Sequence, residues 1–88
     1  MNTIYKYALK ITDNQVIQIP KQNGALSVGE QRGTLCLWAL VNTTDILVDA
    51  HIKIIGTGHP IDDLDLQIWT FLGTVQMNNG LVFHIFVK

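Results

Sequence analysis

Apolar and polar residues alternate with a period of two along most of this chain. In residues 3–11, Lys6 and Lys10 stand between apolar residues that share the opposite face: Tyr5, Tyr7, Leu9 and Ile11. Successive side chains of a β-strand point to opposite faces of a sheet, so this pattern predicts a strand with one face buried. The same period predicts further strands over residues 15–20, 26–31, 34–41, 46–55, 68–77 and 81–88.

Turn-forming residues separate the predicted strands. Turns are expected at the pair Asn23-Gly24, which is the strongest short hairpin signal, at Gly33 and at residues 78–80. Gly29 lies within a strand and indicates a bulge or a close approach of another segment. Residues 61–67 follow Pro60, which suits a first helical position, but this segment has room for only one helical turn.

Two predicted strands, residues 34–41 and 81–88, are apolar on both faces and need cover on both. The period also places four apolar residues of the 68–77 segment on one face: Trp69, Phe71, Val75 and Met77. No amphipathic helix is predicted that could supply the cover, which leaves a second sheet layer or another copy of the chain. We favour another copy. The pattern therefore predicts an all-β fold, a small antiparallel barrel or sandwich of about six or seven strands with at most one short helical turn.

Composition strengthens the expectation of self-association. The 88 residues suit a single β domain over 1–88, in which 48% of residues are apolar and only 15% charged, against an average of about 25% charged. With so few charges, apolar side chains must lie on the surface or in an interface, which predicts a homo-oligomer. The net charge of -1 argues against DNA or RNA as a partner, because nucleic-acid binding needs a basic excess.

The chain also lacks the signals of export and of the membrane. No apolar run approaches the ~20 residues of a membrane span, and the first residues do not form a signal peptide. The expectation is a protein of a reducing cytoplasm. The single cysteine, Cys36, lies in an apolar strand and is expected to act as a small buried hydrophobe.

The stretch GTGHP, residues 56–60, is the best candidate for a binding site. Gly56 and Gly58 permit positive φ, so that successive amides could form a concave nest for phosphate or carboxylate. Thr57 and His59 would add a hydroxyl and a ring donor. The alternative is a tight connection between strands, in which the glycines only satisfy the backbone and His59 is simply exposed.

Other candidate chemistry is weaker. Trp38 and Trp69 could stack on a nucleobase, but core packing is the alternative for both. Asp62, Asp63 and Asp65 lack the spacing of a calcium loop, and the three histidines lack that of a zinc site, so no metal and no cofactor is expected. No nucleophile–base arrangement is legible, and the chain is not expected to be an enzyme.

Several stretches resemble a family of small proteins of unknown function from tailed bacteriophages and prophages. The resemblance covers nearly the whole chain and rests on YKYALKIT, LCLWALV, GTGHPI and the FLGTVQ and GLVFHIF segments, with His84 in the last. The chain departs from the family pattern in NTTDILVDA and DDLDLQIW. The resemblance implies a phage origin and a setting in the host cytoplasm.

The leading hypothesis joins the resemblance to the residues. Small phage proteins often act by stoichiometric binding, and those that sequester nucleotide signals are oligomers with polar pockets. We therefore expect a phage-encoded, non-enzymatic sponge that binds a small anionic, nucleotide-type immune signal and so opposes host defence. The alternatives are a stoichiometric protein inhibitor of a host defence enzyme and a small phage structural or assembly protein.

Overall fold

A computed structural model describes residues 1–62 and 64–88, and all of their side chains except that of Leu26. It confirms the all-β prediction, with seven strands and no helix among the described residues. The strands are β1 (Asn2–Leu9), β2 (Asn14–Pro20), β3 (Asn23–Gln31), β4 (Thr34–Asn42), β5 (Leu47–Gly56), β6 (Thr70–Gln76) and β7 (Val82–Val87). No helix in this described part of the chain is long and apolar enough to cross a membrane.

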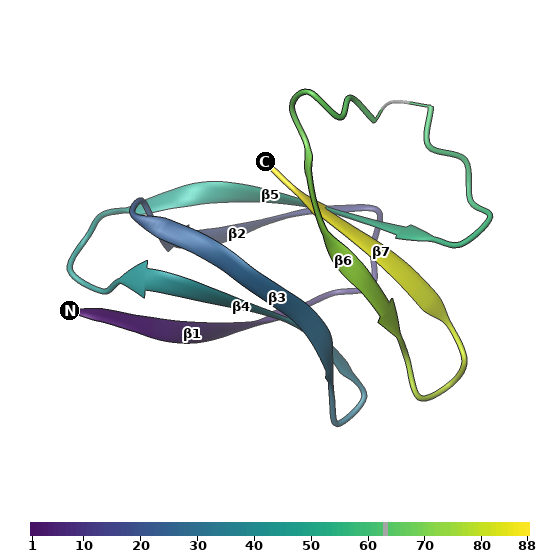
Figure 1. Ribbon diagram of the computed structural model, residues 1–88, viewed down its shortest axis with the longest axis horizontal. Coiled ribbons are helices and arrows are strands. Elements are labelled where there is room, and N and C mark those ends of the chain that lie inside the picture. The colour runs from purple at the N-terminus through teal and green to yellow at the C-terminus, as the bar shows by residue number, and fades with distance from the viewer. Residues whose placement is uncertain (63) are drawn as a thin grey trace.

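The strands form two antiparallel sheets (Figure 1). Sheet A has the order β1-β4-β3, and sheet B has the order β2-β5-β7-β6. The apolar positions of both sheets that face each other form one shared core, with Leu37 of β4 and Ile52 and Ile85 of sheet B at most 2% exposed. The architecture is that of a small sandwich, one of the two arrangements that the alternation predicted.

The pairing of β3 corrects one predicted turn. Asn23 and Gly24 do not form a hairpin turn but lie within β3, opposite Val41 and Leu40 of β4. Because β2 joins sheet B and β3 joins sheet A, the chain changes sheets at residues 21 and 22 instead of folding back on itself. The expected turn at Gly33 is present, and its φ of 82° is one that glycine adopts without strain.

Two irregularities in strand pairing change which face a residue occupies. The register of β3 shifts between Ala25 and Ser27, three residues before the predicted bulge at Gly29. Gly29 itself lies opposite Cys36, and an added Cβ there would lie 3.4 Å from the Trp38 ring, at the edge of ordinary contact. A second shift, between Phe71 and Gly73, puts Phe71 opposite Phe86 on the outer face of sheet B. The prediction that Phe71 shares a face with Val75 is therefore wrong, because an extra residue reverses the alternation.

Residues 57–69, which connect β5 to β6, form a segment that we call the cover. Figure 1 shows it arching from the end of β5 back to the start of β6. Beneath it, the outer face of sheet B buries Lys53, Ile55 and Phe86. The chain itself therefore buries this part of the face, and the expectation that another copy covers apolar surface stays a prediction.

The cover contains one turn of helical type. The Asp65 carbonyl accepts hydrogen bonds from the amides of Ile68 at 3.0 Å and Trp69 at 2.9 Å, and the Asp65 carboxylate accepts one from Gln67 at 2.9 Å. The turn starts at Asp65 and so overlaps the end of the segment 61–67 in which one helical turn was predicted. Of the three aspartates weighed as cation ligands, Asp63 lies outside the described residues.

Candidate functional site

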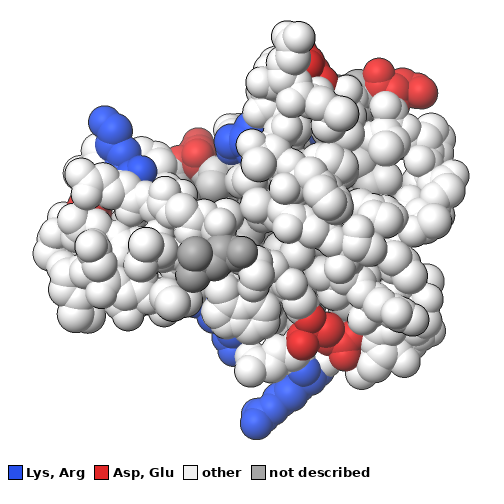
Figure 2. Space-filling model, in the orientation of Figure 1, with Lys and Arg blue, Asp and Glu red and all other residues white. Residues whose placement is uncertain are grey.

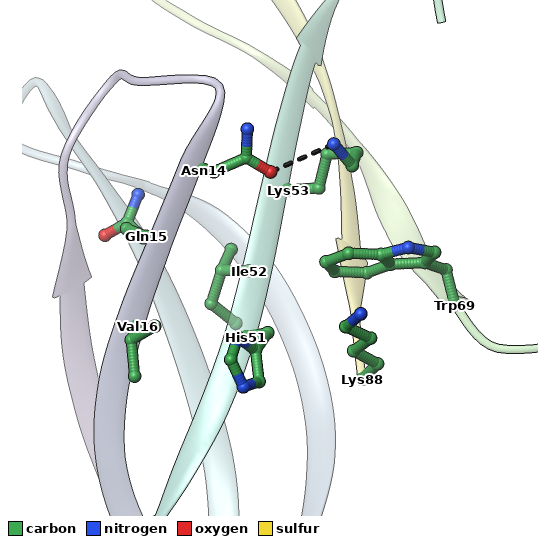
Figure 3. A pocket seen from close by; sticks show the side chains of 8 residues that line it. All are labelled: Asn14, Gln15, Val16, His51, Ile52, Lys53, Trp69 and Lys88. Carbon is green, nitrogen blue, oxygen red and sulfur yellow. Dashed lines mark hydrogen bonds between the residues drawn. The ribbon is translucent and has the colours of Figure 1, made fainter. Parts of the chain in front are cut away.

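The outer face of sheet B carries an open cavity of about 410 Å³, which we call the lysine pocket. It lies between β2, β5, the end of β7 and the last residue of the cover (Figure 3). Its lining consists of Asn14, Gln15, Val16, His51, Ile52, Lys53, Trp69 and Lys88. Two of the six lysine and arginine residues of the chain meet here, and no described lining residue is acidic.

Strand alternation explains why the polar groups converge. Lys53 and His51 are two residues apart on β5, so their side chains share the outer face of sheet B. His51 also exchanges two backbone hydrogen bonds of 3.0 Å with Lys88, which places Lys88 directly across from it. The hydrogen-bonded ladder, with no special loop, therefore brings both lysines to one place.

Trp69 holds the two ammonium groups in position. Its ring centroid lies 5.4 Å from the Lys53 Nζ atom and 4.8 Å from the Lys88 Nζ atom. Figure 3 shows the two lysine side chains on opposite sides of the ring. Each contact is a cation–π interaction, so the ring stabilises two positive charges.

Hydrogen bonds fix two further side chains of the lining. Lys53 is only 5% exposed, and its Nζ atom donates to Asn14 Oδ1 at 2.9 Å. Gln15 bonds both backbone groups of Lys10, at 2.7 and 3.1 Å, and thus closes the β1–β2 turn. Of the two amides in the lining, Asn14 therefore belongs to the lysine pair, while Gln15 has a structural role.

The predicted nest at residues 56–59 uses two of its amides within the chain. The Thr57 amide donates to the Val82 carbonyl at 3.2 Å, and the His59 amide donates to the Gly56 carbonyl at 3.0 Å. Gly58 has a φ of 87°, as a tight turn requires. These contacts agree with a strand connection, and an anion at this loop would have to rely on Gly58 and on side chains.

The side chains of the loop point to different neighbours. The Thr57 hydroxyl lies 2.7 Å from His84 Nε2, and the Thr74 hydroxyl lies 2.9 Å from His84 Nδ1. This bridge of three side chains ties the start of the cover to β6 and β7. The His59 ring lies against Gly56, where a Cβ atom would come within 3.0 Å of it.

The two tryptophans that we proposed as stacking residues lie on different sheets. Trp38 is on the outer face of sheet A, opposite Lys6 and Ser27, whereas Trp69 stands over sheet B. They therefore do not form one stacking platform. Only Trp69 and His59 of the six predicted site residues line a cavity near the lysines.

Sequence reasoning did not identify Asn14, His51, Lys53 and Lys88 as members of one site. The sequence suggested Lys53, with Arg32 and Lys10, as a residue that could neutralise phosphate, with a solvated strand-face charge as the alternative. One signal was available, because alternation places residues 51 and 53 on the same face of a strand. The local pattern does not show which strand pairs with this one, so it does not predict that residue 88 lies beside them. Among the described residues, no three His, Cys, Asp or Glu side chains lie close enough together to hold a metal ion.

Comparison with known proteins gives a family and no activity. No curated protein and no solved structure matches the chain. A family model described as a domain of unknown function, DUF7352, matches residues 1–88, the whole of the sequence. The chain therefore belongs to the DUF7352 family.

Proposed function

We propose that this protein is a non-enzymatic binding protein for a small anionic ligand of nucleotide type, held at the lysine pocket. The observation that carries the proposal is the convergence of the Lys53 and Lys88 ammonium groups on Trp69, in one open cavity. The volume of about 410 Å³ falls within the usual range of about 300–1,000 Å³ for small-ligand sites.

Local charge, and not net charge, supports an anionic ligand. The protein as a whole carries -1, and charged side chains are few on the face shown in Figure 2. The meeting of two ammonium groups in one cavity is therefore a local feature that the net charge does not reveal. Lysine binds phosphate as a point charge, and partial exclusion of water strengthens the attraction.

In this proposal Trp69 does not stack on a nucleobase, which is the role that its residue type first suggested. Lysines flank the ring, so it positions the cations that would hold the anion (Figure 3). His51 and Asn14 are placed to add hydrogen bonds to the bound group.

The biological part of the proposal is sequestration of an immune signal. The resemblance to small phage proteins supports a phage origin, an action in the host cytoplasm and a stoichiometric mode of action. In this proposal the protein is an anti-defence sponge. It works as a homo-oligomer, and its subunits contact one another through exposed apolar surface.

A binding measurement with defined probes tests the proposal. Titration of the purified protein with AMP should show saturable binding, and Lys88→Ala should weaken it by about tenfold through loss of a charged contact. Lys21→Ala is the matched control, because Lys21 is exposed and lies outside the pocket. Equal weakening of AMP binding by both variants would contradict the proposal. So would a failure to bind AMP saturably, together with a failure to bind the nucleotides that are released when protein from infected cells is denatured.

A second candidate function, binding of a protein partner, rests on apolar side chains of the cover and of the start of β6. Four large apolar side chains of residues 61–71 are exposed: Ile61, Leu66 and Ile68 in the cover and Phe71 in β6. Exposed apolar side chains of this kind fit an inhibitor of a host enzyme or an assembly protein. Under this alternative, Leu66→Ser would abolish complex formation in infected cells and leave AMP binding unchanged.

A further inference from the structure

A second open cavity, of about 310 Å³, adjoins the lysine pocket. We call it the cover pocket, because residues of the cover form one of its sides. Its lining consists of Asp13, Asn14, Lys53, Ile55, His59, Pro60 and Ile61. Asn14 and Lys53 line both cavities, so the two hollows are neighbours on the outer face of sheet B.

The wall between the two cavities is fixed. Asn14 and Lys53 are directly paired residues of β2 and β5, and their side chains are joined by the hydrogen bond of 2.9 Å. The deep burial of Lys53 adds to this constraint. A ligand that enters both cavities must therefore lie across this pair.

The two cavities offer different chemistry. Lys53 lines both cavities, whereas the Lys88 ammonium group and the His51 ring line only the lysine pocket, which suits an anion there. The cover pocket presents the Asp13 carboxylate and the His59 ring among apolar groups of Ile55, Pro60 and Ile61. A carboxylate repels phosphate but accepts hydrogen bonds from hydroxyl and amino groups, and aliphatic walls suit the faces of a ring.

The polar groups of the cover pocket are held by the backbone around them. The Asp13 carbonyl accepts a hydrogen bond of 3.1 Å from the Ile54 amide, which anchors this residue beside β5. The His59 ring lies against Gly56, so a larger residue at position 56 would push it away. The backbone of Asp13 and the contact of the His59 ring with Gly56 therefore keep both residues beside the cover pocket.

We infer that the two cavities form one bipartite site that binds a nucleotide across the Asn14–Lys53 pair. The phosphate lies in the lysine pocket, and the sugar and base lie in the cover pocket, where Asp13 and His59 contact their hydroxyl or amino groups. This inference rests on the proposed function and states which part of the nucleotide lies in which cavity. It also assigns the His59 side chain a role in binding, whereas the backbone amides of its loop have none.

Three probes and three variants test the inference by NMR titration. The probes are AMP, inorganic phosphate and adenosine. Lys88→Ala should weaken AMP and phosphate by about tenfold and leave adenosine unchanged. Asp13→Ala and His59→Ala should weaken AMP and adenosine by about fivefold and leave phosphate unchanged. All three side chains are exposed, so the variants should fold, which a single cooperative thermal transition would verify.

The outcomes separate this inference from the proposed function. If AMP binds and depends on Lys88 but not on Asp13 or His59, the bipartite site is wrong and the lysine pocket stands alone. If AMP and phosphate both fail to bind, the proposed function and this inference both fail. If Asp13→Ala weakens phosphate as much as AMP, the division of the two cavities by chemistry is wrong.

Discussion

The outer faces of the two sheets differ in what covers them. On sheet B, Ile55 is 8% exposed beneath the cover, and the polar groups around it line two cavities. On sheet A, the cross-strand pair Leu40 and Ile4 is 45% and 54% exposed, with no segment of the described chain across it. The sequence pattern of β4 and β7 is nevertheless the same, because both are apolar on two faces.

This difference shows what a doubly apolar strand requires. It requires cover, but the cover can be a short irregular segment of the same chain, as it is over sheet B. A segment of this kind brings polar backbone and side chains with it, and a site can form where they meet the sheet. Sheet A keeps apolar surface available for a partner, which is where the predicted homo-oligomer would have to form.

The largest expected effect comes from two aliphatic residues of equal size on the two faces. Ile55→Ala should lower the free energy of unfolding by about 2–4 kcal/mol, because it leaves a cavity under the cover. Leu40→Ala should lower it by less than about 1 kcal/mol, since nearly half of this side chain is already in water. Urea unfolding of both variants measures the difference.

The same pair of variants tests self-association. If Leu40→Ala costs as much as Ile55→Ala, Leu40 must be buried in solution by something outside this chain. The cost would then depend on protein concentration, and light scattering would show a larger particle for the unsubstituted protein than for Leu40→Ala. A cost that is small and independent of concentration would contradict an oligomer formed through this face.

The tryptophans give the next largest contrast. Trp69→Ala should cost about 2–3 kcal/mol and Trp38→Ala about 1 kcal/mol less, because only Trp69 engages two lysines. A double-mutant cycle of Trp69→Leu with Lys88→Met isolates one of these contacts, because leucine has no aromatic ring, with an expected coupling of about 0.5–1 kcal/mol. Zero coupling would mean that the ring and Lys88 are merely neighbours.

The regular strands could be predicted from the sequence because their signal is local. The apolar run of residues 34–41, bounded by turn-forming residues, is enough to predict β4. Local signals failed where one residue changes the phase, as at Leu72, whose insertion turns Phe71 outward. They also failed at Asn23-Gly24, since a turn-forming pair is compatible with an extended strand when the neighbouring strands pair elsewhere.

The candidate site was harder to predict because it depends on pairing between distant strands. His51 and Lys88 meet only because β5 pairs with β7, and Lys53 meets Trp69 only because the cover folds back. The GTGHP stretch stood out because glycine and proline are conspicuous in sequence, whereas lysines on a strand are ordinary. Conspicuous composition indicated where the chain turns, and the polar groups gathered on the strands beside that turn.

Two glycines, one in the cover and one on sheet A, give a smaller contrast. Gly58 has a φ of 87°, so Gly58→Ala should cost about 1–2 kcal/mol in backbone strain. Gly24, opposite Leu40, has no atom within 4 Å of an added Cβ, so Gly24→Ala should be neutral or stabilise by up to about 1 kcal/mol. Thermal unfolding of the two variants measures this difference. If both substitutions change the free energy of unfolding equally, the cover can adopt a turn that does not need a positive φ at residue 58.

The smallest effect concerns the inner side of sheet A, which the cover does not touch. Burial, with a lesser contribution from Tyr5, raises the pKa of Tyr7 above its ordinary value of 10.0. Between the unfolded and folded pKa values the folded state binds more protons, so stability is full below about pH 10 and falls as the pH rises further. Melting temperatures from pH 8.5 to 11 should therefore fall less steeply for Tyr7→Phe than for the unsubstituted protein. Tyr5→Phe leaves the Tyr7 hydroxyl in place, so this variant should keep most of the fall in melting temperature with pH. If the inner face is independent of the cover, Tyr7→Phe should change this fall by the same amount in the Gly58→Ala background.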